Sequence, residues 1–237
     1  MNAAHLRWGA PGPYEVVFST RVGGVSRGSF ESLNLGRLTA DKPENVTMNR
    51  RLLCALAGAD LERLTFNRQV HGAHVRPAVA GEQGEVGDGL WSEESGVPML
   101  AMTADCLPVA LVRAGGKRPA LAVLHAGRLG VLAGVLEAGV ASLGPGRLAA
   151  AIGPAIGPCC YEVGADIADD YARRFGKDVL RGRNLDLWTA AERVLREAGV
   201  ASVERLDLCT HCNPELFFSH RRDAGRTGRQ GVIGYVA

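Results

Sequence analysis

The sequence predicts a single mixed α and β domain spanning residues 1–237. Short apolar runs bounded by glycine, proline or polar residues recur along the chain and indicate strands of a mostly buried sheet. Longer segments with helix start and stop signals lie between them. No segment repeats at a period of about 20–50 residues, and no linker rich in proline and serine divides the chain.

The first part of the chain predicts a strand, a long loop and a helix. Residues 14–18, "YEVVF", are typical of a strand, and residues 19–36 form a loop rich in glycine and serine. A loop of this length often lines a functional site. Residues 41–58 predict a helix that begins near the cap-like Asp41 and ends at Gly58.

The remaining chain alternates between predicted strands and helices. Apolar runs predict strands at 64–70, 97–102, 107–112, 120–124, 148–153, 203–209 and 231–236. Helices are expected at 129–144, 162–175 and 186–198. The last of these has Asp186 as its N-cap and Gly199 as its stop.

Composition and charge exclude several classes of protein. A hydrophobic fraction of 46%, a charged fraction of 22% and a net charge of +2 describe an ordinary soluble protein. A net charge of +2 gives no strong electrostatic attraction to nucleic acid, and an aromatic fraction of 5% provides few stacking surfaces for single-stranded nucleic acid. The N-terminus lacks a basic and apolar leader, and no apolar run reaches about 18 residues, so we expect a cytoplasmic protein without membrane contact. Its six cysteines are then expected to be reduced, buried, catalytic or metal-bound.

Two histidines and one cysteine form a candidate zinc site. His71 and His125 stand at the carboxyl ends of predicted strands, and Cys106 lies in the turn between two others. If these strands neighbour one another in one sheet, the three side chains converge and leave a fourth zinc position open. Each histidine alone equally fits a hydrogen-bonded structural or surface residue. His74 is not expected to be a further ligand, because Gly72 argues against a helix that would place both histidines on one face.

A second cysteine pattern has a simpler interpretation. The segment "CTHC" at 209–212 resembles half of a zinc ribbon, and its second pair would have to be the adjacent Cys159 and Cys160. Because adjacent cysteines seldom chelate together, we expect Cys209 to be buried at a strand end and Cys212 to lie in a loop, without structural zinc.

Anion binding is suggested by two further segments. "HAGRLG" at 125–130 places a glycine-containing turn between a strand and a helix, although it lacks the lysine and hydroxyl residue of a P-loop. The segment 219–230 contains four arginines that suit phosphate recognition or a solvated surface, namely Arg221, Arg222, Arg226 and Arg229. Arg21 lies where a strand enters the long loop, a position from which it can reach into a pocket.

The order of the motifs resembles one known family over about residues 18–235. The segments are "STRVGGVS", "SLNLG", "NRQVHGAHV", "TADCLPVAL", "LHAGRLG", "IGPAIGPCCYEVG", "LDL" and "FFSHRRDAGRTGRQ". Together they are similar to the YfiH-like family, also called the multicopper polyphenol oxidoreductase laccase family and the peptidoglycan editing factors. The combination of "TADCLPV" with "IGPAIGPCCYEVG" is highly specific for this family.

The resemblance implies a fold, a metal site and an activity. It implies an α+β domain with mixed sheets layered between flanking helices, and zinc held by the motif residues His71, Cys106 and His125. It further implies phosphorolysis of adenosine, inosine, guanosine and methylthioadenosine, together with deamination of adenosine. Arg21 and Asn34 lie in motifs that the family places near the site.

This sequence departs from the family pattern beside the zinc ligand. Family members usually have His-Ala-Gly-Trp-Arg-Gly where this chain has His-Ala-Gly-Arg-Leu-Gly, so Arg128 and Leu129 replace the tryptophan and the arginine. We expect Arg128 and Arg21 to neutralise the incoming phosphate. Asp105, next to Cys106, either donates a proton to the base, orients a ligand or caps a turn.

Three other functions compete with nucleoside phosphorolysis. A copper-dependent polyphenol oxidase would need more than the six histidines of this chain. Hydrolysis of peptidoglycan precursors would use Cys106 as nucleophile with a histidine as base. A non-catalytic binding protein would be indifferent to the substitution His125→Ala. We expect a monomer whose partners are a purine nucleoside and phosphate, with zinc rather than copper as cofactor.

Overall fold

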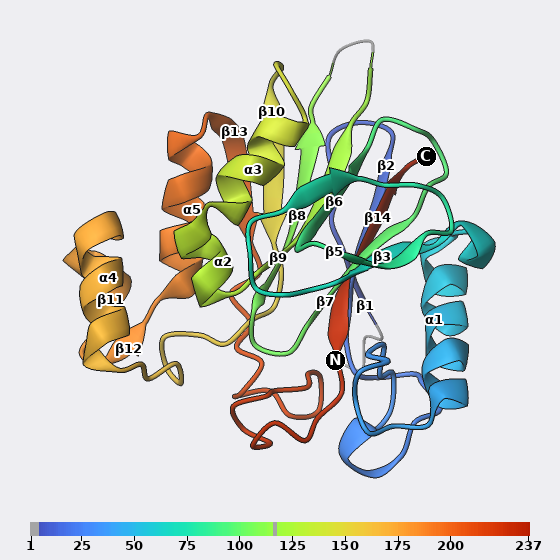
Figure 1. Ribbon diagram of the computed structural model, residues 1–237, viewed down its shortest axis with the longest axis horizontal. Coiled ribbons are helices and arrows are strands. Elements are labelled where there is room, and N and C mark those ends of the chain that lie inside the picture. Colours follow the sequence, from blue (N-terminus) through green and yellow to red (C-terminus); the bar gives the residue numbers. More distant parts are fainter. Residues whose placement is uncertain (1–4, 116–117) are drawn as a thin grey trace.

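The computed structural model describes residues 5–115 and 118–237. Two six-stranded sheets are stacked, with α3 and α5 covering one side and α1 standing on the other, as Figure 1 shows. Residues 1–4 and 116–117 of the predicted domain lie outside the described residues. The expected α+β class, with mixed sheets layered with helices, is confirmed.

The first sheet has, in spatial order, β1 (His5–Arg7), β2 (Tyr14–Ser19), β14 (Gln230–Val236), β7 (Met99–Thr103), β3 (Thr65–Arg68) and β5 (Gln83–Val86). The second has β13 (Val200–Arg205), β10 (Leu148–Ile152), β8 (Leu107–Arg113), β9 (Leu121–Ala126), β6 (Gly89–Ser92) and β4 (Val75–Pro77). A hairpin joins β11 (Leu180–Arg181) to β12 (Asn184–Leu185). The helices are α1 (Pro43–Ala57), α2 (Arg128–Ala133), α3 (Val135–Ser142), α4 (Ala165–Phe175) and α5 (Leu187–Glu197), with 3₁₀ turns at Gly28–Phe30, Leu61–Arg63 and Lys177–Val179.

Alternating side chains of the strands build three apolar layers. In β8, Val109 and Leu111 pack toward α3 and α5, whereas Ala110 and Val112 pack between the two sheets. The other face of the first sheet packs against α1, as Leu100 of β7 does. Because successive residues of a strand point to opposite faces, strands buried on both faces need continuous apolar runs. This explains why the runs are so clear in the sequence.

One strand prediction and one helix prediction need correction. The predicted strands do not form one sheet, because the chain alternates between two sheets and passes from the first to the second after β3, after β5 and after β7. The helix expected at 129–144 is interrupted at Gly134, whose φ of 94° belongs to the left-handed region and ends α2 before α3 begins. The expected helix at 186–198 is present as α5, with the Asp186 carboxylate accepting from the backbone N–H of Thr189 at 3.0 Å.

The start of α1 differs from the sequence prediction. Lys42 occupies the N-cap position, so Asp41 does not cap the helix. The Asp41 carboxylate instead accepts hydrogen bonds from Ser26 Oγ at 2.6 Å and Asn34 Nδ2 at 2.9 Å. It therefore joins the long loop to the beginning of the helix.

Asn49 of α1 fixes the same loop from inside the protein. Its Oδ1 accepts from the backbone N–H of Val25 at 2.9 Å, and its Nδ2 donates to Ser26 Oγ at 2.8 Å and to the carbonyl of Asn34 at 2.9 Å. Asn49 is fully buried. The loop at 19–36 is thus held by a saturated network of hydrogen bonds, although it has little regular structure. Among the described residues, no helix is both long and apolar enough to cross a membrane.

We expect Asn49→Ala to lower the free energy of unfolding by about 3 kcal/mol, because it leaves several buried loop groups without a partner. Urea unfolding measures this change. Arg51→Ala, on the exposed side of the same helix, is the matched control and should change stability by less than about 0.5 kcal/mol. Equal losses in the two variants would show that the asparagine does not anchor the loop.

Candidate functional site

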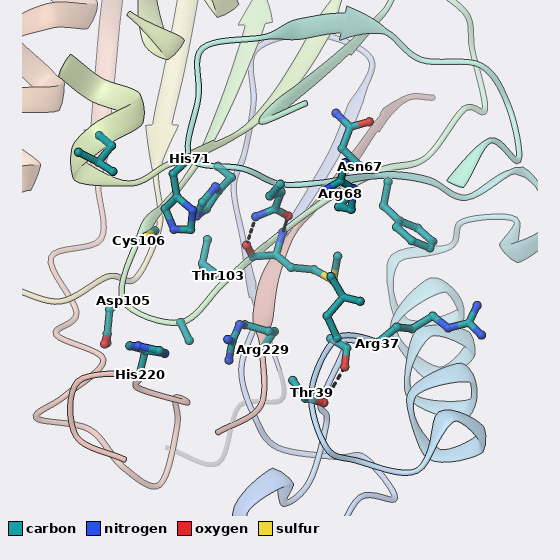
Figure 2. A pocket seen from close by; sticks show the side chains of 18 of the residues that line it. Arg37, Thr39, Asn67, Arg68, His71, Thr103, Asp105, Cys106, His220 and Arg229 are labelled. Atoms are coloured by element: carbon teal, nitrogen blue, oxygen red, sulfur yellow. Dashed lines mark hydrogen bonds between the residues drawn. The ribbon is translucent and has the colours of Figure 1, made fainter. Parts of the chain in front are cut away.

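A cavity of about 750 Å³ opens beside the segments that leave β3 and β7 of the first sheet for the second sheet. Figure 2 shows His71 and Cys106 together at one end of it, close to Thr103, with Arg68 and Arg37 toward the other end. A cavity of this size accommodates a ligand as large as a nucleoside. The lining residues include Arg37, Arg50, Phe66, Arg68, Gln69, His71, Met102, Thr103, Asp105, Cys106, His125, Arg128, Leu129, Tyr161, His220, Arg221 and Arg229.

The structure brings His71, Cys106 and His125 together. Their ligand atoms all lie within 4.8 Å of one another, and the two imidazole rings meet edge to face with centroids 4.7 Å apart. His125 lies in β9 of the second sheet, whereas His71 follows β3 and Cys106 follows β7 of the first sheet. The three side chains therefore converge from two sheets, without the condition that their strands neighbour one another in one sheet. The crossings after β3 and after β7 carry His71 and Cys106 to His125 at the end of β9.

The donor set fits a metal ion. One thiolate and two imidazoles are a ligand set of catalytic zinc sites, which keep a further position open. His74 does not belong to this group, and its carbonyl accepts a hydrogen bond from the backbone N–H of Asp88 at 2.9 Å.

Asp88 is the residue that orients this group. Its carboxylate accepts from the backbone N–H groups of Val70 at 3.2 Å, His71 at 2.9 Å and Gly72 at 2.8 Å. The same carboxylate lies 2.8 Å from Nδ1 of His125. His71 has a positive φ of 61°, a conformation that costs free energy in a residue with a side chain. The bonds to Asp88 stabilise that conformation and leave Nε2 of His125 as the nitrogen free to bind a ligand.

The charges of the group reinforce one another. Burial opposes the thiolate of Cys106, but the charge of His125 and hydrogen bonds from both histidines lower its pKa to about 6. Burial likewise opposes the imidazolium, yet the thiolate of Cys106 and the hydrogen bond to Asp88 raise the pKa of His125. Although burial also opposes its charge, Asp88 has a lowered pKa because His125 and Gly72 donate to it. Cys106 is therefore held in the form that binds metals and attacks electrophiles.

Gly127 permits the close approach of these side chains. A Cβ atom at this position would lie 2.9 Å from Sγ of Cys106 and 2.9 Å from Cδ2 of His71. The glycine of the "HAG" motif is thus required by space rather than by a positive φ. The next two residues, Arg128 and Leu129, both line the cavity, and Leu129 is 50% exposed.

Positive charge dominates the rest of the cavity wall. Six arginines line it: Arg37, Arg50, Arg68, Arg128, Arg221 and Arg229. Among the described lining residues Asp105 is the single acidic one, and its carboxylate is engaged by Thr210 Oγ1 at 2.6 Å and by the backbone N–H of Arg221 at 2.7 Å. Asp105 therefore holds together the loops that form this part of the cavity wall. The excess of arginines favours an anionic ligand.

The structure does not place Arg21 and Asn34 on the cavity wall. Arg21 donates to the carbonyls of Glu31 at 2.6 Å and Pro214 at 2.9 Å, and its guanidinium covers the ring of Phe218. Asn34 is buried, and its Oδ1 accepts from the backbone N–H of Arg229 at 2.9 Å. The substrate-binding role predicted for these two residues gains no support from this placement. Asn34 instead positions Arg229, which does line the cavity.

Sequence reasoning missed several residues of the site. Asp88 follows Gly87 and precedes Gly89 in a segment without clear periodicity, and only its position in a turn before a short apolar run would have drawn notice. Tyr161 lies in the family motif around the cysteines but was not assigned a role. Thr103 gave no chemical signal, yet its hydroxyl is buried without a hydrogen-bond partner among the described residues.

We expect Asp88→Asn to weaken metal binding at His71, Cys106 and His125 by about 10–100-fold, because an amide supplies less negative charge to His125 and fewer acceptor sites to the 70–72 loop. Competition with a chromophoric chelator measures the affinity. Glu85→Gln, an exposed carboxylate-to-amide change on β5, is the matched control and should leave the affinity unchanged. An unaltered affinity in Asp88→Asn would remove this carboxylate from the site.

Comparisons with known proteins agree with the motifs. The family model described as multi-copper polyphenol oxidoreductase laccase matches residues 15–236. A protein of Pseudomonas aeruginosa named purine nucleoside phosphorylase PA4543 is 39% identical over 234 residues, which cover 94% of this chain and 93% of the relative. Purine nucleoside phosphorylase YfiH of Escherichia coli is 36% identical over 233 residues, which cover 94% of each protein.

Solved structures share the fold over nearly the whole chain. The crystal structure of Neisseria meningitidis protein NMB0706 has a TM-score of 0.90 at 32% identity and covers 99% of both chains. That of YlmD from Geobacillus stearothermophilus has a TM-score of 0.87 at 32% identity and covers 100% of this chain and 98% of the other. The chain therefore belongs to the YfiH-like proteins, the multi-copper polyphenol oxidoreductase laccase family.

Proposed function

We propose that this protein is a zinc-dependent purine nucleoside phosphorylase that acts on adenosine, inosine, guanosine and methylthioadenosine and also deaminates adenosine. The observation that carries the proposal is the meeting of His71, Cys106 and His125 within an arginine-lined cavity of about 750 Å³. The names of the relatives, purine nucleoside phosphorylases at 36–39% identity, support the same activity. Six free cysteines fit a reducing compartment, so we propose that the protein works in the cytoplasm, as a monomer.

His71, Cys106 and His125 would hold the zinc ion. When bound, zinc supplies a Lewis acid that polarises an oxygen and activates water for attack on the purine ring. Asp88 fixes the ring of His125 and the backbone of His71, so the ligands are oriented before the ion arrives. Copper is the weaker candidate, because a multicopper centre needs many more histidines than the six in this chain.

Phosphorolysis needs an anion beside the ribose. The bond from C1′ to the purine nitrogen breaks, a bond from C1′ to a phosphate oxygen forms, and the purine takes up the proton that the hydrogen phosphate gives up. We assign the binding of phosphate to the cavity arginines, with Arg128 as the principal one because it lies directly after the zinc-ligand motif. A hydrogen bond to Tyr161 holds the pKa of Arg128 above its usual range, so its charge is permanent.

The apolar part of the wall suits the nucleoside. Phe66, Tyr161 and Leu129 offer apolar faces to a flat base. The hydroxyl of Thr103 is buried without a protein partner among the described residues, which leaves it free to bond a substrate hydroxyl or ring nitrogen. Arg229, held by Asn34 through its backbone, lies on the same wall.

A second candidate function is supported by the contacts of His125, which lies between the thiolate of Cys106 and the carboxylate of Asp88. A thiolate beside an imidazole that is oriented by a carboxylate is also the arrangement of a cysteine hydrolase, as editing of peptidoglycan precursors would require. Alkylation of Cys106 distinguishes the phosphorylase from the hydrolase. Under the phosphorylase proposal, zinc protects Cys106 from iodoacetamide and the metal-free protein is inactive, whereas a hydrolase would be fully active without metal and inactivated by alkylation.

We expect the zinc-loaded protein to convert inosine to hypoxanthine and ribose 1-phosphate only when phosphate is present, as followed by liquid chromatography. Adenosine should also give inosine without phosphate. Cys106→Ala removes a zinc ligand and should reduce both reactions to the level of a blank, while Cys54→Ala, on the buried face of α1, should retain them. Failure of all four nucleosides at confirmed zinc occupancy would rule out the proposed activity.

We expect Arg128→Gln to raise the KM for phosphate about tenfold, equivalent to about 1.4 kcal/mol, because a charged hydrogen bond to the anion is lost. The measurement is initial rate against phosphate concentration at saturating inosine. Arg226→Gln, which changes an exposed arginine outside the cavity, is the control. Should both variants keep the original KM for phosphate, Arg128 does not bind the anion.

A further inference from the structure

Four of the six cysteines gather outside the cavity. Cys159 and Cys160 lie in the turn that follows β10, and Cys209 and Cys212 lie beyond β13. Their four Sγ atoms are all within 4.8 Å of one another. We refer to these residues as the cysteine cluster. The cluster contradicts the expectation that Cys209 and Cys212 lack partners, because the adjacent Cys159 and Cys160 both reach them.

The spacing of the sulfur atoms suits a tetrahedral ion. Sγ of Cys212 lies 3.6 Å from that of Cys159 and 3.3 Å from that of Cys160. Zinc bound by four thiolates at about 2.3 Å requires sulfur atoms about 3.8 Å apart. Small shifts of the side chains therefore complete the coordination sphere.

The backbone holds the cluster in this arrangement. Ala155 forms a bridge with Cys209, in which the backbone N–H of Thr210 donates to the carbonyl of Ala155 at 3.0 Å. The backbone N–H of Cys160 donates to the carbonyl of Gly157 at 2.9 Å, which closes the turn and lets adjacent cysteines face the same point. The backbone N–H of Gly157 also donates to Sγ of Cys209 at 3.3 Å, a contact that stabilises a metal-bound thiolate.

We propose that the cysteine cluster binds a structural zinc ion through four thiolates, at a second metal site that is separate from the cavity. Four soft sulfur ligands select zinc, and a complete set of four leaves no position for a substrate. Each thiol releases its proton to solvent when the ion binds. Cys159 and Cys212 are exposed, so the ion can enter directly from water.

A zinc ion in the cysteine cluster would stabilise two segments that contribute to the cavity wall or contact it. Tyr161, which lines the cavity, follows Cys160 directly in the chain. Thr210 follows Cys209 and donates to the carboxylate of Asp105. An ion that joins the two cysteine pairs would therefore fix both segments to each other.

The test is metal content in a full-length background that lacks the cavity site. In His71→Ala/Cys106→Ala, we expect one zinc per chain by mass spectrometry of the metal, and X-ray absorption with four sulfur neighbours and no nitrogen. Adding the exposed substitutions Cys159→Ser and Cys212→Ser should remove this zinc, whereas adding Cys54→Ala should retain it. Because the background keeps only His125 of the three cavity ligands, the result does not depend on the proposed phosphorylase activity.

Several results would overturn the proposal. One is a background variant without zinc after purification with zinc present. Another is bound zinc with nitrogen or oxygen neighbours, or zinc that survives both serine substitutions. A disulfide between Cys160 and Cys212 in freshly isolated protein, detected as a mass loss of two hydrogens, would assign the cluster to redox chemistry instead. Circular dichroism of each variant separates loss of zinc from loss of fold.

Discussion

The site depends on one buried carboxylate, that of Asp88. It lies where the chain crosses from the first sheet to the second, and it binds both the backbone after β3 and the imidazole of β9. A buried charge is tolerated only when hydrogen bonds and opposite charge surround it, and Asp88 has three backbone donors and one imidazole. The backbone depends on the carboxylate in turn, because His71 needs an acceptor for these N–H groups to keep its positive φ.

A second buried carboxylate organises the opposite wall in the same way. Asp105, also at a positive φ of 88°, lies at the crossing after β7 and binds Thr210 and the backbone of Arg221. Its own carbonyl accepts from the backbone N–H of Ile156 at 2.9 Å. The crossing after β7 thus carries both Cys106 and the carboxylate of Asp105, whereas His71, on the crossing after β3, is fixed by Asp88 from the crossing after β5. His71 and Cys106 lie outside the strands, so hydrogen bonds within a sheet do not hold them in place. The carboxylates of Asp88 and Asp105 supply this rigidity instead.

Much of the fold could be predicted because the physical signals were local. Continuous apolar runs marked the strands buried on both faces, and Asp186 marked the start of α5. The convergence of His71, Cys106 and His125 could be suspected from their residue types, but not the two sheets from which they come. The sheet to which each strand belongs, and the places where the chain crosses between sheets, depend on contacts between residues far apart in the chain. The local pattern of apolar residues carries no information about such contacts. Asp88 was missed for the same reason, since its partners are 16–18 residues upstream and 37 residues downstream.

The departure from the family pattern at 128–129 changes the distribution of charge and apolar surface on the cavity wall, and not the position of the metal-ligand candidates. Both residues line the wall, and consecutive residues at the start of a helix project about 100° apart. An arginine moved from the second position to the first therefore still contributes its charge to the cavity, from a different direction. The leucine then presents an apolar, half-exposed surface where the family pattern has a cation. Meanwhile Gly127, which must approach Cys106 and His71 closely, is retained. The changes at 128 and 129 therefore alter the wall of the cavity, whereas Gly127 keeps the space in which His71 and Cys106 meet.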